Sequence, residues 1–191
     1  KYLDDLKSAG FISAAIPFDK EENTRFIKYS LSDAYLRFYF SFIRPHWDQI
    51  RAKHAKNLFF DIAQSGAYHA WMGRSFEYMC LRHADLIARE LGFAGIHFTV
   101  GPYFLPPRGA RAGVQVVLVF VRPEHVLSVC EMKSSCKRVG VEAVEEMERD
   151  VELLQPIAAR KTIQRVLIVR DKVSQALIDA GYFSRIVDAS R

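Results

Sequence analysis

Two apolar runs in the second half of the chain place the strongest constraint on its fold. Val114–Val121 and Val126–Lys133 each have the length and the β-branched composition of a strand, and Pro123 is placed for a tight turn between them. A third β-rich stretch, Ile96–Phe104, precedes them. We therefore expect two adjacent strands joined as a hairpin, with one further strand before them.

Helical patterns surround this β-rich region. Apolar residues at a spacing of about 3.6 predict one long helix from Phe76 to Leu91, ended by Gly92. After the hairpin the pattern predicts a helix with an acidic face over 142–152, before Pro156, then a strand over 165–169, a helix over 173–180 and a short strand over 185–187. Strands separated by helical crossovers predict an α/β (α+β) fold, in which a mixed sheet is flanked by helices.

The first part of the chain shows a different pattern. Helical spacing over 2–9, with Gly10 as a C-terminal cap, leads into two short apolar stretches, 11–16 and 25–29, around a polar turn. A helix that feeds a β-hairpin is the second half of a winged helix. The same elements would also serve to close a core, and the pattern alone leaves both interpretations open.

An aromatic segment follows the predicted hairpin. Ser32 and Asp33 can cap a helix over 34–43, and Pro45 predicts a break close behind it. Aromatic residues at helical spacing are typical of a buried core, so we expect burial here, with base stacking as the minor alternative. The connector beyond it indicates a solvated helical surface, with phosphate contact as the second interpretation. Its basic residues are Arg44, Arg51, Lys53 and Lys56.

Composition excludes several classes of protein. Half of the 191 residues are hydrophobic, which argues against a disordered chain, and the net charge of +5 permits a polyanionic partner without requiring one. Three cysteines without a C-x-x-C spacing indicate neither a disulfide framework nor a zinc knuckle, so we expect a reducing cytoplasm. The longest uncharged stretch, 93–107, is shorter than the roughly 18 residues of a membrane-spanning helix, and we expect no membrane partner. The chain opens inside an amphipathic segment without a signal-peptide pattern, which predicts a longer parent protein.

Motifs of common hydrolases are missing from the sequence. No glycine is followed by lysine, so there is no Walker A phosphate loop, and neither H-E-x-x-H nor G-x-S-x-G occurs. What does stand out is Glu131-Met132-Lys133 at the end of a predicted strand. Residues i and i+2 of a strand project to the same face, so this carboxylate and this ammonium should share one site. Such a pair suits phosphodiester hydrolysis, but an E-x-K triplet is more often an ordinary ion pair.

The surroundings of this triplet resemble a known superfamily. Residues 113–119, a turn, and residues 127–135 are similar to the catalytic hairpin of the PD-(D/E)XK nucleases, a restriction-endonuclease-like fold. Residues 73–80 resemble the first helix of that fold. The resemblance implies that Glu77, Glu131 and Lys133 are the catalytic residues, that Glu131 and Glu77 hold the metal, and that the cofactor is Mg²⁺ or Mn²⁺ if the site is active.

A narrower resemblance covers nearly the whole chain. Residues 2–12, residues 32–40 and the F-E-x-x-C helix are similar to the C-terminal region of prokaryotic AAA+-type ATPases, in which a winged helix and a nuclease-like domain of unknown function follow the ATPase. This predicts a winged-helix part with its following helix over 1–45, a helical connector over 46–72 and a nuclease-like domain over 73–191. It also implies an upstream ATPase domain in the same chain as a partner.

One position departs from the nuclease pattern. Where that family has an aspartate in G-x-Q-I-D-L, this chain has Val117, which removes a charge that a hard cation needs. Asp85, beyond Glu77 on the same predicted helix, is a conceivable but unsupported substitute. The leading hypothesis is therefore a DNA-binding or regulatory module with a degenerate nuclease-like fold. The alternatives are an active metal-dependent DNA endonuclease and a non-catalytic interaction module, which includes self-association through the acidic helix.

Overall fold

The computed structural model describes residues 1–21, 24–105, 114–134 and 138–190, and it divides into two compact units. The first unit comprises Lys1–Ala15 and Ile27–Ser75, and the second comprises Ile16–Phe26 and Phe76–Arg191. The three domains predicted from the sequence stay a prediction. Several residues of the predicted motifs lie outside the described residues, namely Pro106, Pro107, Gly113, Ser135 and Cys136.

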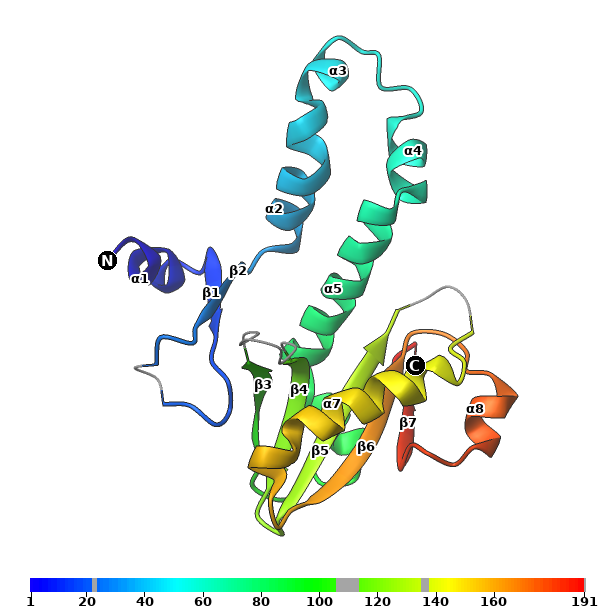
Figure 1. The fold of residues 1–191 in the computed structure, drawn as a ribbon. Helices are drawn as coiled ribbons and strands as arrows, with labels where there is room; N and C mark the ends of the chain where they lie inside the picture. Colours follow the sequence, from blue (N-terminus) through cyan, green and yellow to red (C-terminus); the bar gives the residue numbers. More distant parts are fainter. Residues whose placement is uncertain (22–23, 106–113, 135–137, 191) are drawn as a thin grey trace. The chain divides into compact units, whose positions relative to one another are not determined.

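The first unit opens with the predicted helix and hairpin (Figure 1). Helix α1 (Tyr2–Ser8) is followed by Gly10, whose φ of +77° suits glycine better than any other residue. Strands β1 (Ile12–Ala15) and β2 (Lys28–Leu31) pair antiparallel, with Ile12 opposite Leu31. The helix and the hairpin are thus confirmed, although the second strand lies further along the chain than 25–29. Their assignment to a winged helix stays a prediction.

The aromatic segment forms the next helical run. Asp33 caps α2 (Ala34–Phe38), accepting a hydrogen bond from the Leu36 N–H at 2.7 Å, as expected. The predicted break at Pro45 is wrong. A π-helical turn (Tyr39–Ile43) and a 3₁₀ turn (Arg44–His46) carry the chain into α3 (Trp47–Arg51). Proline is accommodated because its missing N–H falls at the start of the 3₁₀ turn.

Burial divides the aromatic residues of this unit into two sets. Phe38, Phe42, Tyr68 and Trp71 pack together, with Phe42 and Trp71 ring centroids 5.9 Å apart and Tyr68 stacked on Trp71. Other rings are exposed, so the expectation of general burial is only partly correct. The exposed rings of the aromatic segment and of α3 are Tyr35, Phe40 and Trp47.

The connector leads into two further helices, and the second of them continues from the first unit into the second. Helix α4 (Leu58–Gln64) precedes α5 (Gly66–Arg82), whose residues up to Ser75 belong to the first unit and from Phe76 onward to the second. The single predicted helix over 76–91 is two helices, because the chain turns at His83 before α6 (Ala84–Glu90). Gly92 follows with φ of +82°, as expected for the residue that ends the run.

The second unit is built on a five-stranded sheet in the order β3-β4-β5-β6-β7. The strands are β3 (Thr99–Leu105), β4 (Val114–Arg122), β5 (Val126–Lys133), β6 (Thr162–Val169) and β7 (Arg185–Asp188). The first three pair antiparallel and the last three parallel, so the mixed sheet is confirmed. The turn between β4 and β5 contains Pro123 and His125, the latter at φ of +58°.

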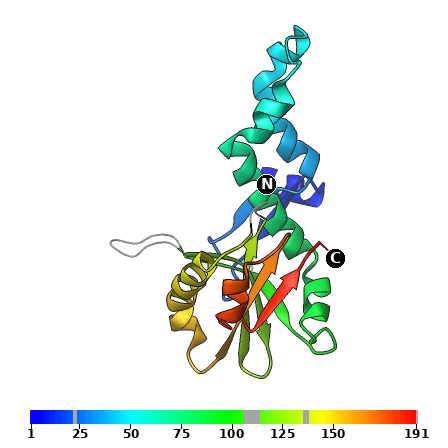
Figure 2. The ribbon, with the colours of Figure 1, turned by 90° about the vertical axis from the view of Figure 1, so that its right-hand side faces the viewer.

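Helices cover both faces of this sheet. Helix α7 (Glu142–Ala158) and α8 (Gln175–Asp179) pack on one face over Leu127, Val129 and Leu167. The end of α5 and α6 pack on the other over Leu118, Phe120 and Ile168. Figure 2 shows α7 and α6 on opposite sides of the sheet. The acidic helix was expected to end before Pro156; instead it includes that proline in its last turn.

Two cysteines lie in the core on the α5–α6 face. Cys80 and Cys130 are both free thiols with almost no exposed surface. Burial raises the pKa of Cys80 to about 12, and burial also raises the pKa of Cys130. Among the described helices, none has the length and apolar character needed to cross a bilayer.

Candidate functional site

Strands β4 and β5 diverge at one end of the hairpin. The pairing of β4 with β5 begins with Arg122 opposite Val126 and ends with Leu118 opposite Cys130. Beyond that point, residues 114–116 of β4 pair only with β3, and residues 131–133 of β5 pair only with β6. The pairing of β3 with β4 also shifts by one residue between Gly101 and Tyr103, so β4 carries a bulge. A pocket of about 250 Å³ lies at this end of the hairpin. Its polar lining comprises Glu77, Gln115, Glu131, Glu146, Arg149 and Asp150.

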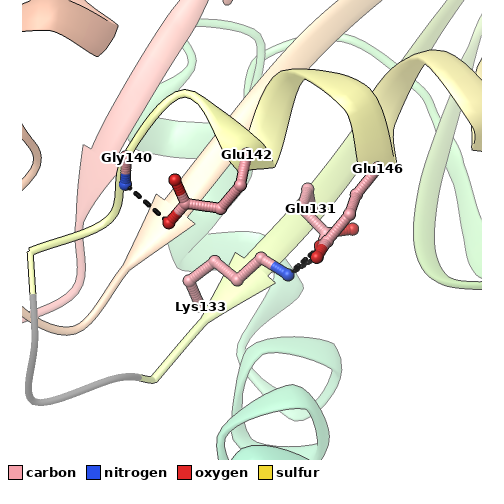
Figure 3. Close-up of polar contacts among 5 residues, drawn as sticks. All are labelled: Glu131, Lys133, Gly140, Glu142 and Glu146. Carbon is pink, nitrogen blue, oxygen red and sulfur yellow. Dashed lines mark hydrogen bonds and ion pairs between the residues drawn. The ribbon is translucent and has the colours of Figure 1, made fainter.

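Glu131 and Lys133 project from β5 to the face covered by α7, as their spacing predicts (Figure 3). The Lys133 ammonium lies 2.9 Å from Glu131 Oε1 and also forms an ion pair with the Glu146 carboxylate of α7. Both members of the Glu131–Lys133 pair are largely buried. One ammonium thus bridges two carboxylates from two different elements.

Burial and pairing act in opposite directions on these two groups. Burial raises the pKa of Glu131, and the hydrogen bond from Lys133 only partly offsets this. Burial disfavours the Lys133 ammonium, but its hydrogen bonds to Glu146 and Glu131 outweigh that effect and raise the pKa of Lys133. The lysine is therefore a charged side chain at neutral pH and provides the main positive charge beside Glu131.

Helix α7 contributes two acidic residues to the site that sequence reasoning missed. Glu146 binds Lys133, and Asp150 lines the pocket one helical turn further on. Burial raises the pKa of Asp150 to about 6, and the nearby Glu131 charge adds to the effect. The acidic helix therefore contributes side chains to the pocket as well as to the solvent-exposed surface. The signal was present, because Glu146 and Asp150 directly precede the buried residues Met147 and Val151.

A neighbouring carboxylate, Glu142, has a different role. It lies at the start of α7 and accepts a hydrogen bond from the Gly140 N–H at 3.0 Å (Figure 3). A bond from its own backbone N–H, together with the bond from Gly140, lowers the pKa of Glu142. Glu142 is therefore part of the helix start, where a negative charge is favourable, and does not line the pocket.

The remaining positions considered for the site are Glu77, Val117 and Asp85, and two of them line the pocket. Glu77, on α5, lines the same pocket as Glu131. Val117 also lines it and packs against the apolar cluster under α5 and α6. Asp85 lies on α6, not on the helix of Glu77, and is not among the pocket residues. The three candidate residues are thus near one end of β5, whereas their catalytic roles stay a prediction.

The side chains do not fit a bound Mg²⁺ or Mn²⁺. Over the ranges that the structure describes, no three His, Cys, Asp or Glu side chains are grouped so that they could hold a metal ion. Hard cations need several oxygen ligands, and here the expected strand aspartate is Val117. The Lys133 ammonium already binds the carboxylates of both Glu131 and Glu146. The described side chains therefore do not support a metal-dependent cleavage step at this site.

Comparisons with known proteins give little. No family model matches this sequence, and no curated protein matches it. Among solved structures, the chain is similar to the crystal structure of a repair endonuclease from Pyrococcus abyssi, with 16% identity and a TM-score of 0.36. The match covers 56% of this chain and 44% of that one, so this chain spans less than half of that endonuclease.

Proposed function

We propose that this chain is a nucleic-acid-binding module whose second unit has a nuclease-like fold that does not cleave. The proposal includes DNA as the principal partner and a regulatory role beside an upstream AAA+-type ATPase domain, both of which come from the sequence resemblance. The main observation that supports nucleic-acid binding is that most of the net positive charge belongs to the first unit.

The positive charge is concentrated in the first unit. That unit has nine Lys and Arg residues against five Asp, which accounts for four of the five net charges of the chain. Its basic segment, defined as Arg44, Arg51, Lys53 and Lys56, is exposed, and the only acidic residue between its ends is Asp48. None of these four side chains forms an ion pair within the described residues. Unpaired, exposed cations of this kind bind phosphates by releasing condensed counterions.

The nuclease-like fold is supported by the order of the elements around the pocket. A helix that carries Glu77 leads to an antiparallel hairpin, and the Glu-x-Lys triplet lies where the two strands of that hairpin diverge. This is the arrangement that the resemblance to PD-(D/E)XK nucleases implies. The absence of cleavage is supported by Val117 and by the two carboxylates that Lys133 already binds.

Salt dependence of binding tests the proposal. Fluorescence anisotropy with a labelled duplex and with its single strand should show an affinity that falls steeply between about 50 mM and 200 mM salt. Replacing Arg51, Lys53 and Lys56 by Gln should reduce the duplex salt slope by roughly 2 to 3, because about 0.9 counterions are released for each phosphate contact.

A matched control removes the same charge elsewhere. Arg82, Arg89 and Arg185 are exposed arginines of the second unit, and replacing all three by Gln should leave the slope unchanged. If the protein binds neither nucleic acid at low salt, the proposed function is wrong. Degradation of the probe in Mg²⁺ that Glu131→Ala abolishes would show instead that the site is an active nuclease.

A further inference from the structure

We propose that the first unit binds single-stranded nucleic acid by stacking bases on an aromatic platform, defined as the exposed rings of Tyr35, Phe40 and Trp47. This inference rests on the proposed function and names the form of nucleic acid that is bound. It concerns a surface that lies outside the nuclease-like pocket.

The three rings form one cluster around a half-buried fourth ring. Tyr39 lies 6.2 Å from Tyr35, 5.3 Å from Phe40 and 6.4 Å from Trp47, measured between ring centroids. All three rings contact this fourth ring, which constrains their positions relative to one another. The helical run from α2 to α3 that carries them is drawn as a ribbon in Figure 1. A fixed set of rings loses little conformational freedom when a ligand binds.

The three platform rings are not part of the buried core of the first unit. Tyr35 is 67% exposed, and Phe40 and Trp47 are each 45% exposed. The structural aromatic set of the unit is the separate group around Phe42 and Trp71. The platform rings therefore offer apolar π surface to solvent, although the unit already has an aromatic core.

Positive charge surrounds the platform and favours a polyanion over an apolar protein. The Arg44 guanidinium lies over the Phe40 ring, 5.5 Å from its centroid, so a cation and a stacking surface occur together. Arg51 follows Trp47 by one helical turn on α3, which places both on the same side of that helix. Alternating cations and rings match a chain of alternating phosphates and bases.

The same geometry selects single strands. In a duplex the base faces are covered by neighbouring bases, so aromatic side chains on a rigid helix cannot reach them. In a single strand each base has a free π face that can stack on a ring, and such stacking tolerates any sequence. We therefore expect single strands to bind more tightly than a duplex of equal length, with little sequence preference.

Tryptophan fluorescence reports directly on the platform. The chain has two tryptophans, Trp47 on the platform and Trp71 in the aromatic core. Titration with oligo(dT) should quench the emission of the intact protein, because a base stacks on the Trp47 indole. In Trp47→Leu the remaining emission from Trp71 should not change on titration.

Affinity measurements on two variants complete the test. Phe40→Leu and Trp47→Leu retain apolar volume and remove the ring, and each should weaken oligo(dT) binding roughly fivefold or more. Their duplex affinity should change little. Phe60→Leu is the matched control, because Phe60 is an exposed ring of the same unit that makes no ring contact among the described residues. Circular dichroism checks that each variant is folded.

The outcomes separate this inference from the proposed function. Loss of oligo(dT) affinity in both platform variants, with Phe60→Leu unchanged, would support it. Equal binding of duplex and single strand, unaffected by either variant, would show that the platform does not bind bases. The proposal of nucleic-acid binding would still stand. Self-association that Trp47→Leu abolishes, without any effect on oligo(dT), would show that a second copy of the chain covers these rings and would also overturn it.

Discussion

Glu131 and Lys133, two residues apart on β5, form an ion pair of 2.9 Å at the point where β5 leaves its hairpin partner. The pair is largely buried, and the same ammonium binds Glu146 of α7. This lysine therefore links the sheet to the helix that covers it. In this chain the Glu-x-Lys triplet therefore has a structural role, because it connects β5 to α7.

Lys133→Met should destabilise the second unit, because Glu131 and Glu146 would then face each other without a cation. Loss of one member of a partly buried pair costs about 1 to 3 kcal/mol of unfolding free energy. The cost should be larger at pH 8 than at pH 5, since burial raises the pKa of Glu131 and eases its protonation. Urea unfolding at both pH values measures this.

The second member of the pair provides the control for that experiment. In Lys133→Met/Glu131→Gln the buried charge is absent, so part of the lost stability should return. Lys172→Met, which removes an exposed lysine of the same unit, should change stability little. A loss that is equal at both pH values and is not recovered in the double variant would contradict the role assigned to the ammonium.

Asp150→Asn should stabilise the protein at pH 7 and flatten its dependence on pH. The pKa of Asp150 is about 6 in the folded state, above its ordinary value of about 3.9, so the folded state holds the proton more tightly. Stability is therefore highest below pH 4 for this group and falls as the pH rises from about 4 to 6. Because solvent screens a partly exposed carboxylate, we expect a gain of roughly 1 kcal/mol at pH 7.

Denaturant unfolding at a series of pH values checks the Asp150 prediction. Glu152→Gln is the matched control, since it removes an exposed acid from the same helix. A wild-type stability that rises between pH 4 and pH 6, with no change in that slope in Asp150→Asn, would mean that other groups control the pH dependence. NMR titration of the Asp150 carboxyl would give its pKa directly.

Val117→Asp should create a Mn²⁺ site that the natural chain lacks. The new carboxylate would enter the pocket that Glu77 and Glu131 already line. Isothermal titration should detect binding in the variant and none in the wild type or in Val117→Asn, which has the same shape without the charge. At a metal concentration of about 100 Kd, the variant should gain roughly 2.7 kcal/mol of stability. Wild-type binding that Glu131→Ala removes would contradict this.

The sheet could be predicted because its signals are local. The hairpin turn at Pro123, the strand lengths and the helical crossovers all lie within short stretches of sequence, and they indicate a mixed sheet. Prolines were less informative. Pro45 lies at the start of a 3₁₀ turn and Pro156 in the last turn of α7, so neither one ends its helix.

The candidate site could be predicted only in part. Glu131 and Lys133 share a face because strand periodicity requires it. Glu146 and Asp150 were missed because their contact with β5 depends on how α7 packs across the sheet, which no local pattern specifies. The turn at His83 was also missed. No glycine or proline marks it, and the apolar spacing continues from α5 into α6.

The two core thiols give the second unit a chemical reporter of its own unfolding. Thiolates rather than thiols react with alkylating agents, and burial of Cys80 and Cys130 keeps both protonated and inaccessible in the folded state. In a Cys136→Ser background, the rate of alkylation would follow the opening of this core alone, because the first unit contains no cysteine. Labelling followed over time would thus measure the unfolding of the second unit separately from that of the first.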